Sequence, residues 1–268
     1  GLTCVEELGE TNGKKVYQNP YALELGMKAA DTVFDEMEYE DPFTYQNQLF
    51  SHILGRKVEL FRKVEPELLV ANDMLSFHFP AQGRKDQLYG YVDSQVEDLV
   101  LYIDGEYRCS YACWLSYDVF DVGTMNQERW VDFANYRGTE ETMQGYFYYL
   151  DQQVFEQVIE ELRENDFDTE IFEDGYVSGT YQAEEAGNLL LTIPYDAGWR
   201  ARVNGKEAVC RQGADALTVI EVEEGENQIV MEYQVPGQTA GILVTGVSFL
   251  LMGLWCSYKK WSGYLRRR

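Results

Sequence analysis

The residues best suited to chemistry in this sequence surround a short turn near position 197. Tyr195, Asp196 and Trp199 lie in the segment 189–209, whose pattern predicts a strand, a tight turn from Asp196 to Gly198 and a second strand. Aromatic rings can stack on the apolar face of a sugar while a carboxylate accepts hydrogen bonds from its hydroxyls. The three side chains are therefore a candidate glycan-binding site. The alternative is that this aromatic-flanked turn closes the core of a β-sandwich.

Two further aromatic residues, Trp114 and Trp130, complete the set of candidate glycan-binding side chains. No catalytic residue can be assigned. Glycoside hydrolysis needs two carboxylates roughly 5 to 9 Å apart. The chain has 46 acidic residues, and no pattern selects a pair among them. This activity stays an alternative without assigned residues.

The sequence predicts no metal site and no cofactor. Its five cysteines lack a metal-binding or redox spacing, and its two histidines are too few to complete a zinc site. Calcium in an acidic loop near Asp93, Glu97 and Asp98 stays open, because oxygen ligands are plentiful there. No EF-hand spacing is present.

The charge of the chain excludes one class of partner. The formal net charge is -24, although the segment after position 258 contains five of the 22 basic residues, namely Lys259, Lys260, Arg266, Arg267 and Arg268. The rest of the surface is strongly acidic and repels nucleic acid and bare anionic lipid. We therefore expect no nucleic-acid partner.

A membrane-spanning helix is predicted near the C-terminus, at residues 238–261. Within it, residues 240–258 are 19 uncharged residues that at 1.5 Å per residue span about 28 Å, close to the hydrocarbon thickness of a bilayer. Basic residues follow, so the positive-inside rule places the tail 262–268 in the cytoplasm and the bulk of the chain on the extracytoplasmic side. A buried core helix is the alternative.

One face of this helix contains the small residues Gly241, Thr245 and Ser248. Small residues let another helix approach closely, so the predicted partners are the membrane and other transmembrane helices of a parent protein. The alternative is that these residues are merely tolerated in a helix that faces lipid.

The remaining sequence predicts a mainly β fold with minor α. Residues 1–63 are expected to form a mixed α/β segment and residues 64–150 a β-sandwich or jelly-roll-like unit. Residues 151–237 are expected to form a linking amphipathic helix, at 151–165, and a second such unit.

Local signals support several of these elements. Asp41 and Pro42 are an N-cap and first-turn pair that begins a helix, and Gly55 ends it. The pairs Asp104–Gly105 and Asn204–Gly205 predict hairpin turns between strands.

Several short motifs follow one another along the chain. They lie at Asn19 to Leu23, Leu25 and Gly26; Pro42, Phe43, Gln46 and Asn47; Ile193 to Trp199; Asn204, Gly205 and Lys206; Gly225, Asn227 and Ile229; and Tyr233, Pro236 and Gly237 before the last helix. In their order and spacing these motifs resemble the YfhO family of bacterial multi-pass membrane proteins. The match runs nearly end to end. Because the sequence opens on Gly1 and not on Met, we expect it to be a piece of a longer protein.

This resemblance implies a parent protein with many membrane helices, similar to glycosyltransferases that use a polyprenyl-phosphate sugar donor and act on cell-envelope glycopolymers. The catalytic acidic residues of such enzymes lie among the first helices, so the resemblance assigns none to this chain, and we expect the chain alone not to be catalytic. Its expected role is to position acceptor glycan or lipid-linked donor at the bacterial cell membrane. The alternative is a non-catalytic membrane-anchored adhesion or glycan-binding module.

Overall fold

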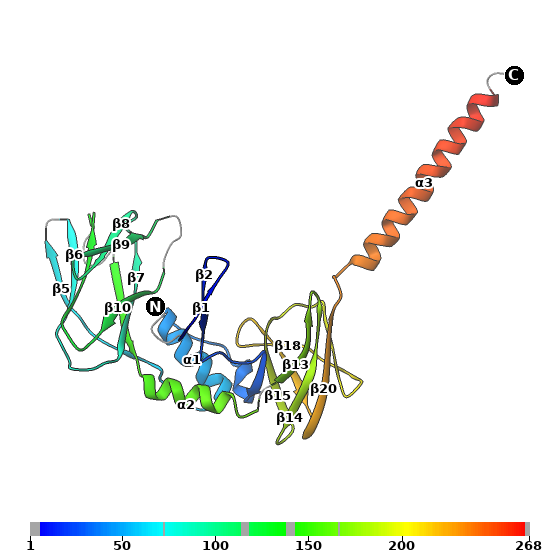
Figure 1. Cartoon of the computed structure of the whole chain (residues 1–268). Helices are drawn as coiled ribbons and strands as arrows, with labels where there is room; N and C mark the ends of the chain where they lie inside the picture. Colours follow the sequence, from blue (N-terminus) through cyan, green and yellow to red (C-terminus); the bar gives the residue numbers. More distant parts are fainter. Residues whose placement is uncertain (1–5, 72, 114–117, 138–142, 166, 266–268) are drawn as a thin grey trace.

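The fold is mainly β, as the sequence predicts, and ends in one long helix. The computed structural model describes residues 6–71, 73–113, 118–137, 143–165 and 167–265. Figure 1 shows two β bodies with helices α1 and α2 between them, and helix α3 leaving the second body on the side away from the first.

The first β body is a sandwich of two antiparallel sheets, with strand orders β10-β7-β12-β4 and β5-β6-β11-β8-β9. The strands are β4 Phe61–Lys63, β5 Glu67–Ala71, β6 Met74–Phe79, β7 Gln87–Ser94, β8 Leu99–Ile103, β9 Glu106–Tyr111, β10 Phe120–Thr124, β11 Arg129–Ala134 and β12 Met143–Leu150. Side chains on a strand alternate between its faces. Accordingly Leu99, Leu101 and Ile103 are buried together with Phe147 of the facing sheet, which makes one core.

The second β body is also a sandwich, with strand orders β13-β14-β20-β16-β17 and β18-β19-β15-β3. The strands are β3 Gly26–Ala29, β13 Phe167–Glu173, β14 Tyr176–Ala183, β15 Gly187–Pro194, β16 Trp199–Val203, β17 Lys206–Ala208, β18 Arg211–Gly213, β19 Leu217–Val222 and β20 Gly225–Tyr233. Leu189 and Leu191 of β15 face the inner core, whereas Leu190 belongs to a separate cluster with residues of α1 and α2. Strand β15 is therefore buried on both faces, which explains its continuous apolar run.

Helices α1 (Pro42–Leu54) and α2 (Gln152–Leu162) cover the outer face of that sheet, together with the short 3-10 helix η1 (Asp31–Phe34). The predicted start and end of α1 are confirmed: the Asp41 carboxylate caps the first turn, and Gly55 ends the helix with a φ of 65°. The side chain of Asp151 caps α2 by accepting a hydrogen bond from the backbone N–H of Val154.

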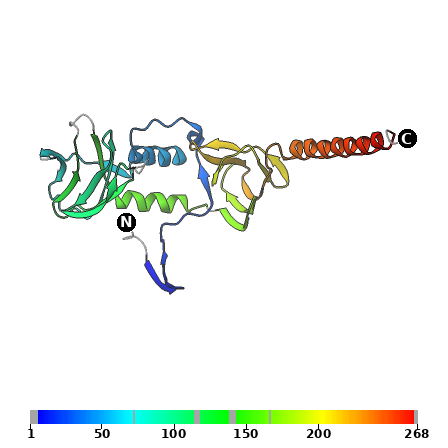
Figure 2. The same cartoon turned by 90° about the horizontal axis from the view of Figure 1, so that it is seen from above.

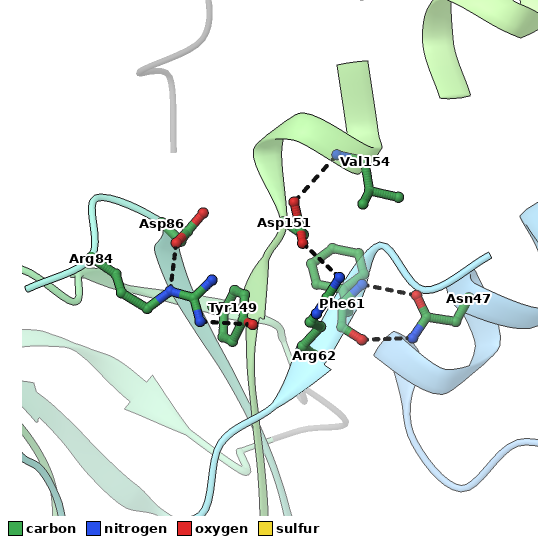
Figure 3. Close-up of polar contacts among 8 residues, drawn as sticks. All are labelled: Asn47, Phe61, Arg62, Arg84, Asp86, Tyr149, Asp151 and Val154. Carbon is green, nitrogen blue, oxygen red and sulfur yellow. Dashed lines mark hydrogen bonds and ion pairs between the residues drawn. The ribbon is translucent and has the colours of Figure 1, made fainter. Parts of the chain in front are cut away.

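Polar contacts fasten both helices to the first sandwich (Figure 3). The side-chain amide of Asn47 on α1 donates to the Phe61 carbonyl at 2.7 Å and accepts from the Phe61 N–H at 2.9 Å. Asn47 thus pairs with edge strand β4 as a neighbouring strand would. Arg62, the next residue of β4, forms a 2.9 Å ion pair with Asp151, the residue that caps α2.

The strands within the first 63 residues belong to three different parts of the fold. The hairpin of β1 (Glu6–Thr11) and β2 (Lys14–Gln18) projects from the body, and among the described strands it pairs only with itself (Figure 2). Strand β3 pairs with β15 of the second sandwich, and β4 pairs with β12 of the first. The domain boundary near residue 63 therefore stays a proposal.

Helix α3 (Gln238–Leu265) contains a candidate membrane span at Gln238–Tyr258, no part of which is buried in the chain. Within the described part of the chain, the helix is therefore not a buried core helix. The helix runs past its expected end at position 261, and the basic residues 266–268 lie outside the described part of the chain.

Candidate functional site at the membrane-proximal turn

The turn between β15 and β16 is organised by the carboxylate of Asp196. Its Oδ1 accepts a hydrogen bond of 2.7 Å from the backbone N–H of Gly198, and the Asp196 carbonyl accepts one of 3.1 Å from the Trp199 N–H. An aspartate whose side chain accepts a hydrogen bond from the backbone N–H two residues ahead forms an Asx turn. Local hydrogen bonds therefore stabilise the tight turn at residues 196–198.

The same carboxylate is bonded to the strand that leads into the membrane helix. Tyr233, the last residue of β20, donates from its phenol to Asp196 Oδ1 at 3.0 Å. The backbone N–H of Gln234 donates to the Gly198 carbonyl at 2.9 Å. Trp199 pairs with Tyr233 in the sheet, with ring centroids 5.2 Å apart in an edge-to-face arrangement. Only positions 234–237 separate Tyr233 from α3.

The two aromatic candidates at this turn have different surroundings. Tyr195 is 36% exposed, and its backbone N–H donates to the Ala216 carbonyl at 2.8 Å, which fixes its backbone beside β19. Trp199 is half-buried and packs against the core of the second sandwich. The ring of Tyr195 is thus the more accessible of the two.

Further exposed apolar side chains lie at the same end of the sandwich. The β13–β14 turn is held there because the Tyr233 N–H donates to the Gly175 carbonyl at 2.7 Å. Phe172, just before that turn, is 67% exposed, and Val235, just after β20, is also exposed. We call Phe172, Tyr195, Tyr233 and Val235 the membrane-proximal rim. Amphipathic aromatic rings of this kind are enriched where a protein meets the headgroup region of a bilayer.

Two hydroxyl groups on α3, those of Thr245 and Ser248, are satisfied within the helix. Thr245 donates to the Gly241 carbonyl at 2.8 Å and Ser248 donates to the Val244 carbonyl at 2.7 Å. These bonds leave the face of Gly241, Thr245 and Ser248 small and free of unmet donors, as close helix packing requires.

The other predicted site residues are not brought to this turn. Trp130 lies on β11 of the first sandwich, stacked on His78 with ring centroids 4.2 Å apart. Helices α1 and α2 lie between that sandwich and the one that contains Trp199 (Figure 1). Trp114 lies outside the described residues.

Metal binding gains no support from the geometry. Within the described ranges, no group of three or more His, Cys, Asp or Glu side chains is placed to hold a metal ion. This holds for the acidic loop of Asp93, Glu97 and Asp98 as well.

Sequence reasoning did not identify Tyr233 as part of the site. It noted this residue only as one position of a motif, and the hydrogen bond to Asp196 spans 37 positions of the chain. A signal was available, because Tyr233 and Pro236–Gly237 place an aromatic residue directly before the break that precedes the membrane helix.

These features define a class of membrane protein in which a β-sandwich is joined at one end to a candidate transmembrane helix. The family described as "Bacterial membrane protein YfhO" matches residues 5–245, so this chain belongs to the YfhO family. The uncharacterized protein YfhO of Bacillus subtilis (strain 168) is 27% identical over 81 residues, which are 30% of this chain and 9% of that protein. The chain therefore corresponds to a small part of that relative.

Similar solved structures include a β-glucuronidase from Ruminococcus gnavus. It is 12% identical, with 59% of this chain and 31% of that chain covered, at a TM-score of 0.24. The same enzyme in complex with D-glucuronic acid is 11% identical, with 61% and 34% covered, at a TM-score of 0.23. TM-scores this low carry no argument about the fold or activity of the present chain.

Proposed function

We propose that this chain is the extracytoplasmic accessory part and last membrane helix of a glycosyltransferase that uses a polyprenyl-phosphate sugar donor on cell-envelope glycopolymers. The upstream helices of the parent protein carry the catalytic residues, and this chain positions substrate. One observation supports the positioning role above the others: Asp196 is hydrogen-bonded to Tyr233, at the point where the sandwich becomes the membrane helix.

The location of the turn suits a lipid-linked substrate. A polyprenyl chain lies in the bilayer, so the sugar attached to it is held at the membrane surface. Tyr195 offers an exposed ring for stacking, and the Asp196 carboxylate accepts hydrogen bonds, both at the end of the sandwich from which α3 departs.

The surface of α3 is consistent with a parent protein that contains further transmembrane helices. Gly241, Thr245 and Ser248 form a small-residue face in a span that nothing in the described chain covers. We propose that other transmembrane helices of the parent protein pack there.

Labelling of Cys109 tests the proposed orientation. Its thiol is free and exposed on β9 of the first sandwich. In intact cells that express the full chain with its other cysteines replaced by serine, a membrane-impermeant maleimide should label this thiol, and Cys109→Ser should remove that labelling. Labelling that requires cell lysis would contradict an extracytoplasmic location.

A titration tests substrate binding. The chain is placed in lipid nanodiscs and titrated with a polyprenyl-phosphate sugar while its tryptophan fluorescence is recorded. We expect saturable binding that Tyr195→Ala weakens several-fold, because loss of a stacked ring costs about 1 kcal/mol. Tyr107→Ala is the matched control, since Tyr107 is an exposed tyrosine of the first sandwich. No binding, or equal loss in both variants, would refute the positioning role.

A second candidate function rests on strand β5. All five of its residues are exposed, including Leu68, Leu69 and Val70, and it lies at the edge of its sheet. An exposed apolar edge can pair with a strand of another protein, which favours a non-catalytic adhesion module that holds a partner protein. The gene upstream of Gly1 distinguishes the two: many hydrophobic segments support the transferase, and a signal peptide alone supports the module.

A further inference from the structure

A separate cavity of about 340 Å³ lies at the N-terminal end of α1, and its walls are rich in tyrosine. Its lining residues are Tyr39, Glu40, Asp41, Pro42, Tyr45 and Tyr91. The rings of Tyr39 and Tyr45 meet edge to face with centroids 4.8 Å apart. Tyr39 is 55% exposed, so solvent reaches a large part of its ring.

The loop that forms this cavity is held in place before any ligand arrives. Thr44 Oγ1 accepts hydrogen bonds from the backbone N–H groups of Glu40, at 3.3 Å, and Asp41, at 3.2 Å. The side chain of Gln48 donates to the Glu38 carbonyl. A binding loop that is already ordered loses less conformational entropy on binding.

Asp41 helps to build the cavity and is not available to a ligand. Its carboxylate is buried, accepts from the backbone N–H groups of Phe43 and Thr44, and accepts from the phenol of Tyr148 at 3.0 Å. Glu40, in contrast, is exposed at the rim. The carboxylate that can meet a ligand is therefore that of Glu40.

The surroundings of the cavity are negative. None of its six lining residues is basic. Burial, followed by the carboxylates of Glu40, Asp41 and Asp93, raises the pKa of Tyr146 beneath the loop. Lys63 is a nearby cation: its ammonium group is paired with Glu65 at 2.8 Å, and this hydrogen bond, with smaller contributions from the charges of Asp41 and Glu40, raises its pKa. An incoming cation would find its counter-charge here.

We propose that this cavity binds a ligand through an alkylated ammonium group, which packs against the faces of Tyr39, Tyr45 and Tyr91 and is neutralised by Glu40. Aromatic faces attract cations through their quadrupole, and cages of such rings are a common way to bind quaternary ammonium groups. The carboxylate of Glu40 disfavours an anionic ligand, and none of the described lining residues is basic. This proposal does not depend on the transferase proposal.

Choline and its neutral isostere 3,3-dimethyl-1-butanol test the proposal. The full 268-residue chain in nanodiscs is titrated calorimetrically with each at constant ionic strength. We expect saturable binding of choline and at least about tenfold weaker binding of the alcohol, since a cation–π cage with a carboxylate is worth more than 1 kcal/mol over apolar contact. Equal binding of the two would overturn the proposal, as would no saturable binding of choline.

Variants localise the binding. Tyr39→Ala and Glu40→Gln should each weaken choline binding about threefold. Glu106→Gln and Tyr107→Ala are the controls, because they change an exposed Glu-Tyr pair on β9 and should leave the affinity unchanged. Glu40→Gln keeps the shape of its side chain, so it remains informative even if Tyr39→Ala perturbs the fold. If the control variants weakened choline binding as much as the variants in the cavity, this result would contradict the assigned site.

Discussion

The phenol of Tyr233 donates a hydrogen bond of 3.0 Å to the carboxylate of Asp196. This bond joins two parts of the chain: the turn that contains the candidate sugar-binding residues, and β20, the last strand before α3. The backbone bond from Gln234 to the Gly198 carbonyl strengthens the connection. These bonds fix the turn to the end of β20, close to the start of α3. Under the proposed function, a substrate bound at Tyr195 would be held near the membrane surface.

Gly198→Ala should break this connection. A Cβ at position 198 would lie 2.6 Å from Cε2 of Tyr233 and 2.7 Å from the Gln234 carbonyl oxygen, so the turn must shift. We expect the free energy of unfolding to fall by about 1–3 kcal/mol. Chemical denaturation in micelles measures it. Gly187→Ala in β15 is the control, because its Cβ would meet nothing within 4 Å.

Asn227→Ala should destabilise the second sandwich without touching the proposed site. Asn227 is fully buried, donates to the carbonyls of Glu223 and Gly225, and accepts from the Glu223 N–H and the Asn204 side chain. Removing it leaves buried groups without partners, at a cost of about 2–3 kcal/mol. The exposed neighbour Gln228→Ala should change stability by less than about 0.5 kcal/mol. Similar losses in both would argue against this role.

Stability should fall in alkaline solution because of buried tyrosines. Burial raises the pKa of Tyr181 to about 12 and also raises the pKa values of Tyr111 and Tyr148, the last with help from Asp41. Above pH of about 10 the unfolded chain loses these protons while the folded chain keeps them. These tyrosines therefore contribute fully to the free energy of unfolding below that pH, and the free energy of unfolding decreases above it.

Each such tyrosine contributes a slope of up to about 1.4 kcal/mol per pH unit between the two pKa values. Urea midpoints between pH 9 and 11.5 measure the slope. Tyr181→Phe removes one titrating group and should make the slope shallower; an unchanged slope would show that Tyr181 does not titrate differently in the two states.

The membrane-proximal rim should lie in the headgroup region. An environment-sensitive dye on Phe172→Cys, in a chain with its native cysteines replaced by serine, should shift its emission to the blue when the chain enters nanodiscs. Position 172 is in register with Met231, close to Tyr233, whereas Glu226 lies at the far end of β20. The same dye on Glu226→Cys should not shift. Equal emission at both positions would place the rim away from the lipid.

Helix ends and hairpin turns could be predicted from the sequence, because residues next to one another in the chain determine them. Asp41 and Gly55 specify the ends of α1 through capping and a left-handed backbone. Asp104–Gly105 and Asn204–Gly205 turn their hairpins with positive φ at all four residues, as predicted. The candidate membrane span follows from composition alone, and the described helix covers it.

Contacts between distant segments could not be predicted in this way. Nothing local indicates that β3 pairs with β15, that Asn47 pairs with the backbone of Phe61, or that Asn204 bonds to Asn227. These asparagines occupy positions of the family motifs, and the structure gives both Asn47 and Asn227 a structural role. The Asp196 motif differs, because its turn also presents the exposed ring of Tyr195.

The sugar content of envelope glycopolymers tests the central claim most directly. It should be compared between cells with the full-length parent gene, cells lacking it, and cells in which the parent protein carries Tyr195→Ala. We predict that deletion removes one sugar from a polymer and that the variant reduces that sugar at unchanged protein level. A polymer that keeps its full sugar content after deletion would contradict the account.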